Sequence, residues 1–407
     1  MLGELEMTEG QVPAVVLSLY YSGLALVRSL GRRGIPVYAM DHAVTNVGLY
    51  SKYAQMYVCP DPKIKSDRLL KYLQALRRRI LCRPVLFPTG DEYVLFVSRN
   101  RKELDKDFEI VMSDRKVQEN LVSKSGLHKI AISAGVPEPQ TYTIKTPNEL
   151  SRISEEIPYP CILKPVHSKS WHKPEIRALI GHKKVIKVDT PERLAYWYKK
   201  IALIDARMII QEVIPGGDDH LYYVPSYVDR NSRILGAFIG RKVRVTPIHF
   251  GSASFVETIY DPKLLELNRK LLHSVKYRGL VGVEYKLDPR DDKYKLIEVN
   301  ARWGLWDGLG DRCGIDLGYI AYLDAIGQKV EPVSTYYAGK KWFSLDRDVS
   351  AFLQYRKEGS LNLKNWLATL SLDMMHACFA RDDLGPTVKL VKNNLDKLVH
   401  SGIRSYL

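Results

Sequence analysis

The stretch 279–302 constrains the fold of this chain more than any other part of the sequence. Apolar and polar residues alternate on both sides of the segment 288–292, Asp-Pro-Arg-Asp-Asp. That segment has turn chemistry, because proline fixes φ and aspartate tolerates tight turns. The pattern therefore predicts two antiparallel strands joined by a short turn. A hairpin centred near Asp291 places Glu284 opposite Glu298.

Two carboxylates that face each other across a sheet repel, so we expect a cation between them. Asn300 and Arg302 are predicted on the same face as Glu298, with Ile297 and Val299 on the other face. Two carboxylates and an amide carbonyl form an all-oxygen set. Such a set suits Mg²⁺, which shares its shell with water and phosphate oxygens. The alternative is a solvated sheet face that is acidic without binding metal.

The composition is that of a globular chain with two or three domains. Of 407 residues, 45% are hydrophobic and 26% are charged, which favours a sizeable core over disorder. The net charge of +15 favours anionic partners, namely nucleotides, acidic metabolites, anionic lipid surfaces or nucleic acid. Because the basic residues are spread along the chain, no nucleic-acid partner is expected.

Cysteine usage and the N-terminus predict a cytoplasmic location. The five cysteines are widely spaced and form no C-x-x-C pair, which argues against a zinc site or a disulfide framework. Acidic residues at positions 4, 6 and 9 precede the first apolar run, where a signal peptide would carry basic residues. No uninterrupted apolar stretch is long enough to span a bilayer.

The first part of the chain, 1–113, has the pattern of a Rossmann-like parallel-sheet domain. It opens with a strand, a helix and a second strand over 12–40, and right-handed crossover makes a parallel sheet the default. The turn at 20–23 lacks the glycines that admit a dinucleotide, so NAD or FAD is not expected. Asp91 and Glu92 follow a predicted strand and are candidate substrate contacts. The alternative is that they cap the next helix.

The pattern changes at 114. A mixed α+β domain is predicted over 114–330, beginning with helical periodicity over 117–134. A mainly helical C-terminal extension is predicted over 331–407.

The order of the polar residues in the second domain resembles that of the ATP-grasp enzymes. A lysine near a helix start and a lysine ending a strand precede an apolar hinge strand, and the acidic hairpin follows. The matching residues are Lys124, Lys164-Pro165, Gln211-Glu212-Val213-Ile214, Glu284 and Glu298-Val299-Asn300-Ala301-Arg302. The E-x-N-x-R hairpin is the most specific of these elements.

The resemblance implies ATP as cofactor, with a role for each segment. Lys124 and Lys164 correspond to phosphate-binding lysines. The backbone of the hinge strand, namely Gln211, Glu212, Val213 and Ile214, corresponds to the segment that reads the adenine edge. Asp218 falls where an acidic residue holds the ribose hydroxyls, with Asp219 as the alternative.

The resemblance also implies the metal and the catalytic residues. Glu284, Glu298 and Asn300 match the ligands of Mg²⁺, with Mn²⁺ as a second candidate. Arg302 matches the arginine that steadies the transferred phosphoryl group. One arginine of the segment 240–244 is expected to assist, and Arg244 is the one we favour.

One departure from the family pattern concerns the flap over the phosphates. Members place a glycine-rich loop shortly after the second lysine, whereas here 166–173 contains no glycine. Backbone amides, the hydroxyls of Ser168 and Ser170, and the charge of Lys169 are the groups available to cover the phosphates. The alternative is an ordinary exposed loop.

The predicted function is an ADP-forming carboxylate–amine ligase. A substrate carboxylate attacks the γ-phosphate, Lys164, Arg302 and the metal disperse charge, and an amine displaces phosphate from the acyl phosphate. The acid is a small molecule or is linked to a polymer, and a homo-oligomer is one of the states expected. Three alternatives remain: a thiol acceptor or carboxyphosphate-type chemistry, an inactive ATP-binding regulator, and a nucleic-acid-binding protein.

The C-terminal extension interleaves large aromatic residues with lysines and arginines. We favour packing of the aromatics against the rest of the molecule, with the cations reaching solvent. The alternative is a basic amphipathic surface for peripheral contact with an anionic membrane or an acidic polymer.

Overall fold

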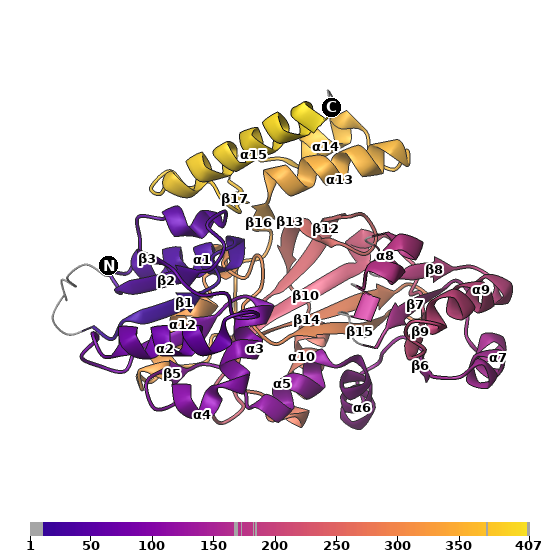
Figure 1. The fold of residues 1–407 in the computed structure, drawn as a ribbon, viewed down its shortest axis with the longest axis horizontal. Helices are drawn as coiled ribbons and strands as arrows, with labels where there is room; N and C mark the ends of the chain where they lie inside the picture. The colour runs from indigo at the N-terminus through magenta and orange to yellow at the C-terminus, as the bar shows by residue number, and fades with distance from the viewer. Residues whose placement is uncertain are drawn as a thin grey trace.

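The structure, a computed structural model, describes residues 11–166, 170–171, 173–181, 183, 185–371 and 373–404. Three sheets follow one another across the molecule (Figure 1). The N-terminal parallel sheet lies at one end, a four-stranded sheet lies at the other, and a large sheet lies between them. The C-terminal helices run along one side of this row.

The N-terminal sheet is parallel, in the order β3-β2-β1-β4-β5. Its central strand is fully buried on both faces, as its run of alanine, valine and leucine predicts. The strands are β1 (Ala14–Leu17), β2 (Val37–Asp41), β3 (Gln55–Val58), β4 (Val85–Pro88) and β5 (Glu109–Ile110). The helices are α1 (Tyr21–Gly31), α2 (Ser66–Arg77), α3 (Asp91–Arg99) and α4 (Arg101–Leu104), with a 3-10 turn at Val47–Tyr50. The Rossmann-like prediction is confirmed.

The helical stretch predicted over 117–134 is two helices, α5 (Arg115–Val122) and α6 (Lys124–Ala134). Ser123 between them is extended, and its hydroxyl accepts a hydrogen bond from the Gly126 amide at 3.3 Å. This is N-cap chemistry, which helical periodicity alone does not reveal. The break places Lys124 at the first position of α6.

The four-stranded sheet has the order β6-β9-β7-β8 and is antiparallel. One face packs against helices in an apolar cluster that includes Leu163 and Ile210. Lys164 and Gln211 follow these residues in the strands and so face the other way. The elements are β6 (Thr141–Ile144), α7 (Pro147–Glu156), β7 (Cys161–Pro165), α8 (Pro174–Ile180), β8 (Ile186–Val188), α9 (Pro191–Ala202) and β9 (Met208–Glu212).

The large sheet has the order β15-β14-β10-β12-β13-β16-β17, with β11 paired to β10. A 3-10 turn, η3 (Asp218–His220), precedes it. Its strands are β10 (Leu221–Val228), β11 (Ile234–Ala237), β12 (Ile239–Thr246), β13 (Ser252–Ile259), β14 (Gly279–Asp288), β15 (Lys293–Asn300), β16 (Lys341–Phe343) and β17 (Met375–His376). Helices α10 (Pro262–Ser274), α11 (Leu309–Arg312) and α12 (Leu317–Ala325) complete this part.

The predicted hairpin is confirmed as β14 and β15, with Glu284 directly opposite Glu298. One detail of the prediction is wrong. Ile297 is an extra residue in β15, because Tyr285 pairs with Leu296. Leu296 and Val299 are therefore the buried apolar residues, while Ile297 is only half-buried.

The C-terminal extension is mainly helical, as predicted, with α13 (Leu345–Lys357), α14 (Leu363–Thr369) and α15 (Gly385–Arg404). It also adds the short strands β16 and β17 to the large sheet. Trp342, Phe343, Phe352 and Tyr355 are buried. The prediction that the aromatics pack against the rest of the molecule is confirmed for these four.

Candidate functional site

The two predicted phosphate lysines converge from different elements. The Lys124 ammonium donates to the Pro165 carbonyl at 2.9 Å, and the Lys164 ammonium donates to Gln211 Oε1 at 2.6 Å. Burial lowers the pKa of Lys124 to about 8. Burial and the Lys124 charge lower the pKa of Lys164 to about 7. The charge of Glu298 opposes both shifts, so the two lysines and the hairpin carboxylate share one electrostatic environment.

The hinge strand is tied to its neighbours by polar side chains. Gln211 bridges Lys164 and Thr141, whose hydroxyl accepts from Nε2 at 2.8 Å. Glu212 accepts from the Gln140 amide at 2.8 Å and pairs with Arg290. The side chain of Gln211 is therefore already engaged with Lys164. The groups of the hinge that remain for a ligand are those of its backbone.

The next two residues of the hinge, Val213 and Ile214, differ in whether the backbone amide has a hydrogen-bond partner. The Val213 amide donates to the Pro160 carbonyl at 3.1 Å. Ile214 is buried, and its amide makes no hydrogen bond to any residue that the structure describes. A buried amide without a partner is costly, so it is a natural donor for a ligand nitrogen.

The predicted metal ligands lie together on the hairpin. Glu284 and Glu298 are register partners, and Asn300 pairs with Gly282 one step along the same face. A side chain at Gly282 would collide with the Tyr223 hydroxyl, 1.7 Å from the position of its Cβ. Glycine is therefore required here, because the Tyr223 side chain occupies the space over this strand position. Two carboxylates and an amide oxygen on one face of the hairpin fit a hard divalent cation.

Lys242 on β12 places a cation of the protein beside one of the two facing carboxylates, Glu284. Its ammonium is buried and donates to Glu284 Oε2. Lys242 belongs to the segment 240–244, in which an arginine, Arg244, was predicted to assist. In a regular strand, positions 242 and 244 share a face, so the sequence pattern alone does not separate them.

Arg244 does not lie on the hairpin face, and its predicted catalytic role is not supported. β12 carries an extra residue at Val243, because Lys242 pairs with Val256 whereas Arg244 pairs with Phe255. Val243 packs with Phe255 on the face opposite Lys242. The Arg244 guanidinium is buried there and binds both carboxylate oxygens of Asp348, at 2.9 Å each. The bulge therefore turns Arg244 toward the C-terminal helices.

Arg302 follows β15 and reaches the N-terminal domain. Its guanidinium binds Asp91 and donates to the Trp303 carbonyl at 3.1 Å. Asp91 is the first residue of α3, where a carboxylate is favourable in the first helical turn, and its contact with substrate stays a prediction. Glu92 instead lies 3.8 Å from the Lys63 ammonium and forms no hydrogen bond or ion pair with Arg302 or Asp91.

Asp218, the candidate ribose ligand, is buried next to β12 and α13. Its Oδ2 accepts from the His249 amide at 2.9 Å and from the Tyr355 hydroxyl. Asp219 is exposed and lies 3.1 Å from His220. The Lys286 ammonium donates to the Gly216 carbonyl at 2.9 Å. Burial lowers the pKa of Lys286, and the Asp218 charge partly offsets that shift.

Asp307 and Tyr223 are buried polar residues beside Arg302 that the sequence analysis did not single out. Asp307 accepts from the Gly304 amide at 2.6 Å, and burial raises its pKa to about 7. Burial also raises the pKa of Tyr223, with contributions from Asp307 and the hairpin glutamates. The signal was the loop 303–310, but composition does not say which of its side chains turns inward.

Of the predicted flap, Ser168 and Lys169 lie outside the described residues.

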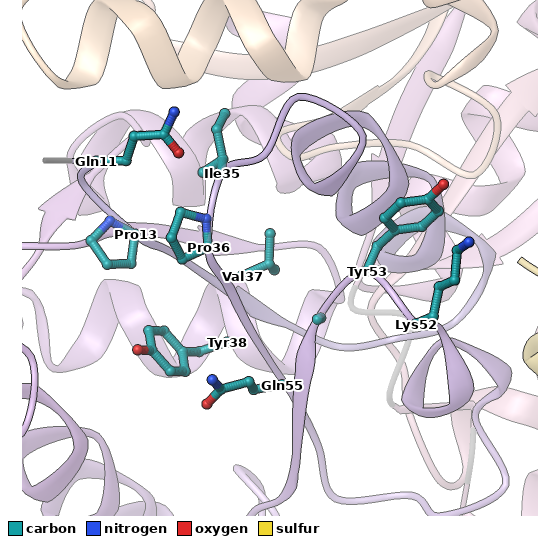
Figure 2. Close-up of a pocket in the computed structure, with 10 residues that line it drawn as sticks. Gln11, Pro13, Ile35, Pro36, Val37, Tyr38, Lys52, Tyr53 and Gln55 are labelled. Carbon is teal, nitrogen blue, oxygen red and sulfur yellow. The ribbon is translucent and has the colours of Figure 1, made fainter. Parts of the chain in front are cut away.

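A cavity with a volume of about 260 Å³ lies near the beginnings of β2 and β3 and is lined in part by Tyr38, Lys52 and Tyr53 (Figure 2). Ligands of parallel sheets bind at the carboxyl ends of the strands, so we do not assign this cavity to the site.

Comparison with known proteins finds relatives in sequence. No protein-family model matches the chain. A D-aspartate ligase of Enterococcus faecium is 25% identical over 305 residues, covering 72% of this chain and 68% of the relative. A carbamoyl phosphate synthase large chain, C-terminal section, of Methanopyrus kandleri is 21% identical, covering 45% of this chain and 33% of the relative.

Solved structures share the fold at low sequence identity. An L-amino acid ligase from Bacillus licheniformis has a TM-score of 0.59 and 14% identity, covering 79% of this chain and 76% of that one. A biotin carboxylase from Campylobacter jejuni, crystallised with an ATP analogue, has a TM-score of 0.63 and 18% identity, covering 81% and 74%.

The chain thus shares its fold with these solved structures and is similar in sequence to these two relatives. The relatives and structural neighbours named above are ligases, synthases or carboxylases.

Proposed function

We propose that this protein is an ADP-forming carboxylate–amine ligase of the ATP-grasp type. An oxygen of the substrate carboxylate attacks the γ-phosphorus of ATP, the bond to the β-phosphate oxygen breaks, and ADP leaves. The nitrogen of an amine then attacks the acyl carbon, phosphate departs, and the amine loses a proton. The acid is a small molecule or is linked to a polymer, and no nucleic acid takes part.

Each group of residues has its own role in nucleotide binding and phosphoryl transfer. Lys124 and Lys164 hold phosphate oxygens as point charges from two elements. The backbone at Ile214 receives the adenine edge. Arg302 steadies the phosphoryl group in transfer, with Asp91 orienting its guanidinium.

Glu284, Glu298 and Asn300 would hold Mg²⁺, with Mn²⁺ as an alternative. When bound, the metal neutralises charge on the transferring phosphates. Lys242 holds Glu284 in place beside Glu298 through its ion pair.

The observation that carries the proposal is the convergence of two buried lysines on an acidic hairpin. Burying two ammonium groups is expensive, and their lowered pKa values reflect that cost. An anionic ligand would remove the cost. The facing carboxylates, which repel each other, would gain in the same way from a divalent cation. A metal-bound triphosphate satisfies both needs at once.

The test is ADP release by the purified chain with Mg-ATP across a panel of carboxylates with amines. The expected result is ADP formed only when both partners are present. Parallel assays with thiols and with bicarbonate cover the other acceptor chemistries. Nucleotide binding without ADP release from any pair would favour the inactive regulator and overturn the proposal.

Location and self-association are also part of the proposal. The five cysteines are free, which supports a reducing cytoplasm. No helix in the described ranges has the length and apolar character needed to cross a bilayer. A homo-oligomer remains a prediction, which sedimentation of the purified chain would check.

We also propose peripheral contact with an anionic membrane through an outer apolar stripe of the C-terminal helices. These helices lie along one side of the molecule (Figure 1), and the side chains of the stripe are between 38% and 67% exposed. The stripe consists of Leu345, Val349, Leu353, Leu363, Leu367, Leu384, Val388, Val391 and Leu395.

The charge around this stripe favours an anionic surface over a second copy of the chain. Several acidic residues of the extension are paired with cations of the rest of the chain, as Asp348 is with Arg244 and Asp383 with Arg28. Five exposed cations have no ion-pair partner among the described residues, namely Arg356, Lys357, Lys364, Arg381 and Lys392. A second copy would bring like charges together, whereas anionic lipid would neutralise them.

Vesicle co-sedimentation tests this contact. The chain is expected to bind vesicles containing phosphatidylserine and not purely zwitterionic ones, and Val391→Asp should remove the binding. Leu203→Asp, at a side chain that is 87% exposed on another part of the surface, is the matched control. Concentration-dependent dimers that Val391→Asp dissolves, without vesicle binding, would overturn the membrane assignment.

A further inference from the structure

The carboxylate of Asp218 is held from one side only. The Tyr355 hydroxyl and the His249 amide both donate to Oδ2, and the His249 ring nitrogen Nδ1 lies 3.3 Å from the same oxygen. No hydrogen bond to Oδ1 involves a residue that the structure describes. One oxygen is therefore saturated, and the other remains available to a ligand.

Tyr355 belongs to α13, far from Asp218 in the sequence. Burial raises the pKa of Tyr355, as does its hydrogen bond to Asp218, so the hydroxyl stays a proton donor at neutral pH. The same hydroxyl accepts from the Val245 amide at 3.4 Å. It thus joins the end of β12 to the turn that carries Asp218.

Two further contacts fix α13 at this place. Two turns before Tyr355, Asp348 binds the Arg244 guanidinium through both oxygens. Just after the helix, the Glu358 carboxylate lies 3.1 Å from Nε2 of His249, whose amide holds Asp218. The inner face of α13 therefore acts on the Asp218 turn by a direct bond and by a second route through His249.

We propose that Tyr355 is a positioning residue of the nucleotide site, through which α13 orients Asp218 toward the ribose hydroxyls. The inference rests on the proposed function, because it takes Asp218 as the ribose ligand. It makes the C-terminal extension part of the nucleotide site. With Oδ2 fixed, the carboxylate loses little conformational freedom when Oδ1 accepts from a ribose hydroxyl.

The test compares binding of ATP with binding of 2′,3′-dideoxy-ATP, which lacks both ribose hydroxyls. The full-length wild type is expected to prefer ATP by about tenfold, the value of one good charged hydrogen bond. Asp218→Asn should reduce that preference. Tyr355→Phe should weaken ATP binding by about fivefold and leave dideoxy-ATP binding unchanged.

Tyr294→Phe is the matched control. The Tyr294 hydroxyl also donates to an aspartate, Asp261, at 2.6 Å, but this pair lies at the start of α10. The variant should keep the wild-type preference for ATP. Thermal unfolding of both variants checks that each remains folded at the temperature of the binding assay.

The outcomes separate a positioning role from a structural one. If Tyr355→Phe weakens both nucleotides equally, or neither, α13 does not orient the ribose ligand and the inference is overturned. If Asp218→Asn keeps the preference for ATP, the ribose assignment fails and the inference with it. Failure of the proposed function has a different signature, because it appears as missing ADP release while nucleotide binding persists.

Discussion

Two ion pairs on β12 invite comparison, because they begin two residues apart and serve opposite purposes. Lys242 binds Glu284 on the face of the hairpin, and 14% of the Glu284 side chain stays exposed. Arg244 binds Asp348 on the other face, with the two side chains 4% and 0% exposed. Asp348 also accepts from Ser254 and Trp366, each at 2.8 Å.

The difference between these pairs is saturation. Asp348 has its oxygens filled by protein donors, so the pair holds the C-terminal extension against the sheet and has no capacity for a ligand. Glu284 faces Glu298 and keeps an edge toward solvent, so its pair is incomplete without a further cation. Both pairs join a buried cation to a carboxylate. They differ in whether the carboxylate can still accept a further ligand.

The largest effect is expected beside the Lys242–Glu284 pair, from the substitution Glu298→Gln. The change removes a hard metal ligand and should reduce Mg-ATP turnover by about a thousand-fold, equivalent to several kcal/mol. It also relieves repulsion with Glu284, so the melting temperature should stay level or rise. Steady-state ADP release and calorimetry measure the two effects. Glu257→Gln, at an ion pair of the same sheet with Arg241, is the control.

A lower melting temperature with retained activity would break the comparison. It would make Glu298 a structural residue, like Asp348, and remove the hairpin from the site.

A change in the Arg244–Asp348 pair should lower the stability of the fold. Asp348→Ala leaves the buried Arg244 uncompensated, so we expect the free energy of unfolding to fall by about 3–5 kcal/mol. Urea unfolding measures it. Asp382→Ala removes a half-exposed partner of Arg32 in the same extension and should cost less than about 1 kcal/mol. Equal losses in the two variants would contradict the role assigned to the Arg244 pair.

Substitutions of Lys164, which lies on the four-stranded sheet, test the predicted phosphate site. Lys164→Ala should weaken ATP binding by about 2–3 kcal/mol, because a charge-assisted phosphate contact disappears from a buried position. Lys164→Arg keeps the charge but misplaces it, so its loss should be smaller. Isothermal titration gives both affinities. Wild-type affinity in the alanine variant would remove Lys164 from the phosphate site.

The smallest effect is a pH dependence of ATP binding. The pKa values of Lys164 and Lys124 are lowered to about 7 and about 8, so in the free protein both lose charge as pH rises through that range. Phosphate favours the charged forms, and binding must then take up protons. Affinity should fall by about five- to tenfold from pH 7 to pH 8.

Titration in buffers of different ionisation enthalpy reveals this proton uptake. Lys164→Ala should take up fewer protons at pH 8 than the wild type. Proton release in place of uptake would contradict the depressed lysine pKa values.

The elements predicted well from the sequence are those whose evidence is local. The hairpin and the pairing of Glu284 with Glu298 follow from alternation and turn chemistry. The bulges at Val243 and Ile297 could not be predicted, because one extra residue leaves the apolar pattern almost unchanged. Ser123 shows the same limit in helices, since its capping role is visible only once the break is known.

Contacts between segments far apart in the sequence also could not be predicted. Tyr355 and Asp218 are separated by 137 positions, and the mixed aromatic and basic composition of the extension gave no partner for either. The packing of that extension was predicted from its aromatics, but its approach to the turn that carries Asp218 depends on the tertiary fold.

The extra residue at Val243 also governs how residue roles pass between related chains. An alignment without a gap across β12 matches Arg244 to a residue that lies on the hairpin face of any relative whose strand is regular. A transferred catalytic arginine would then be assigned to a side chain on the wrong surface.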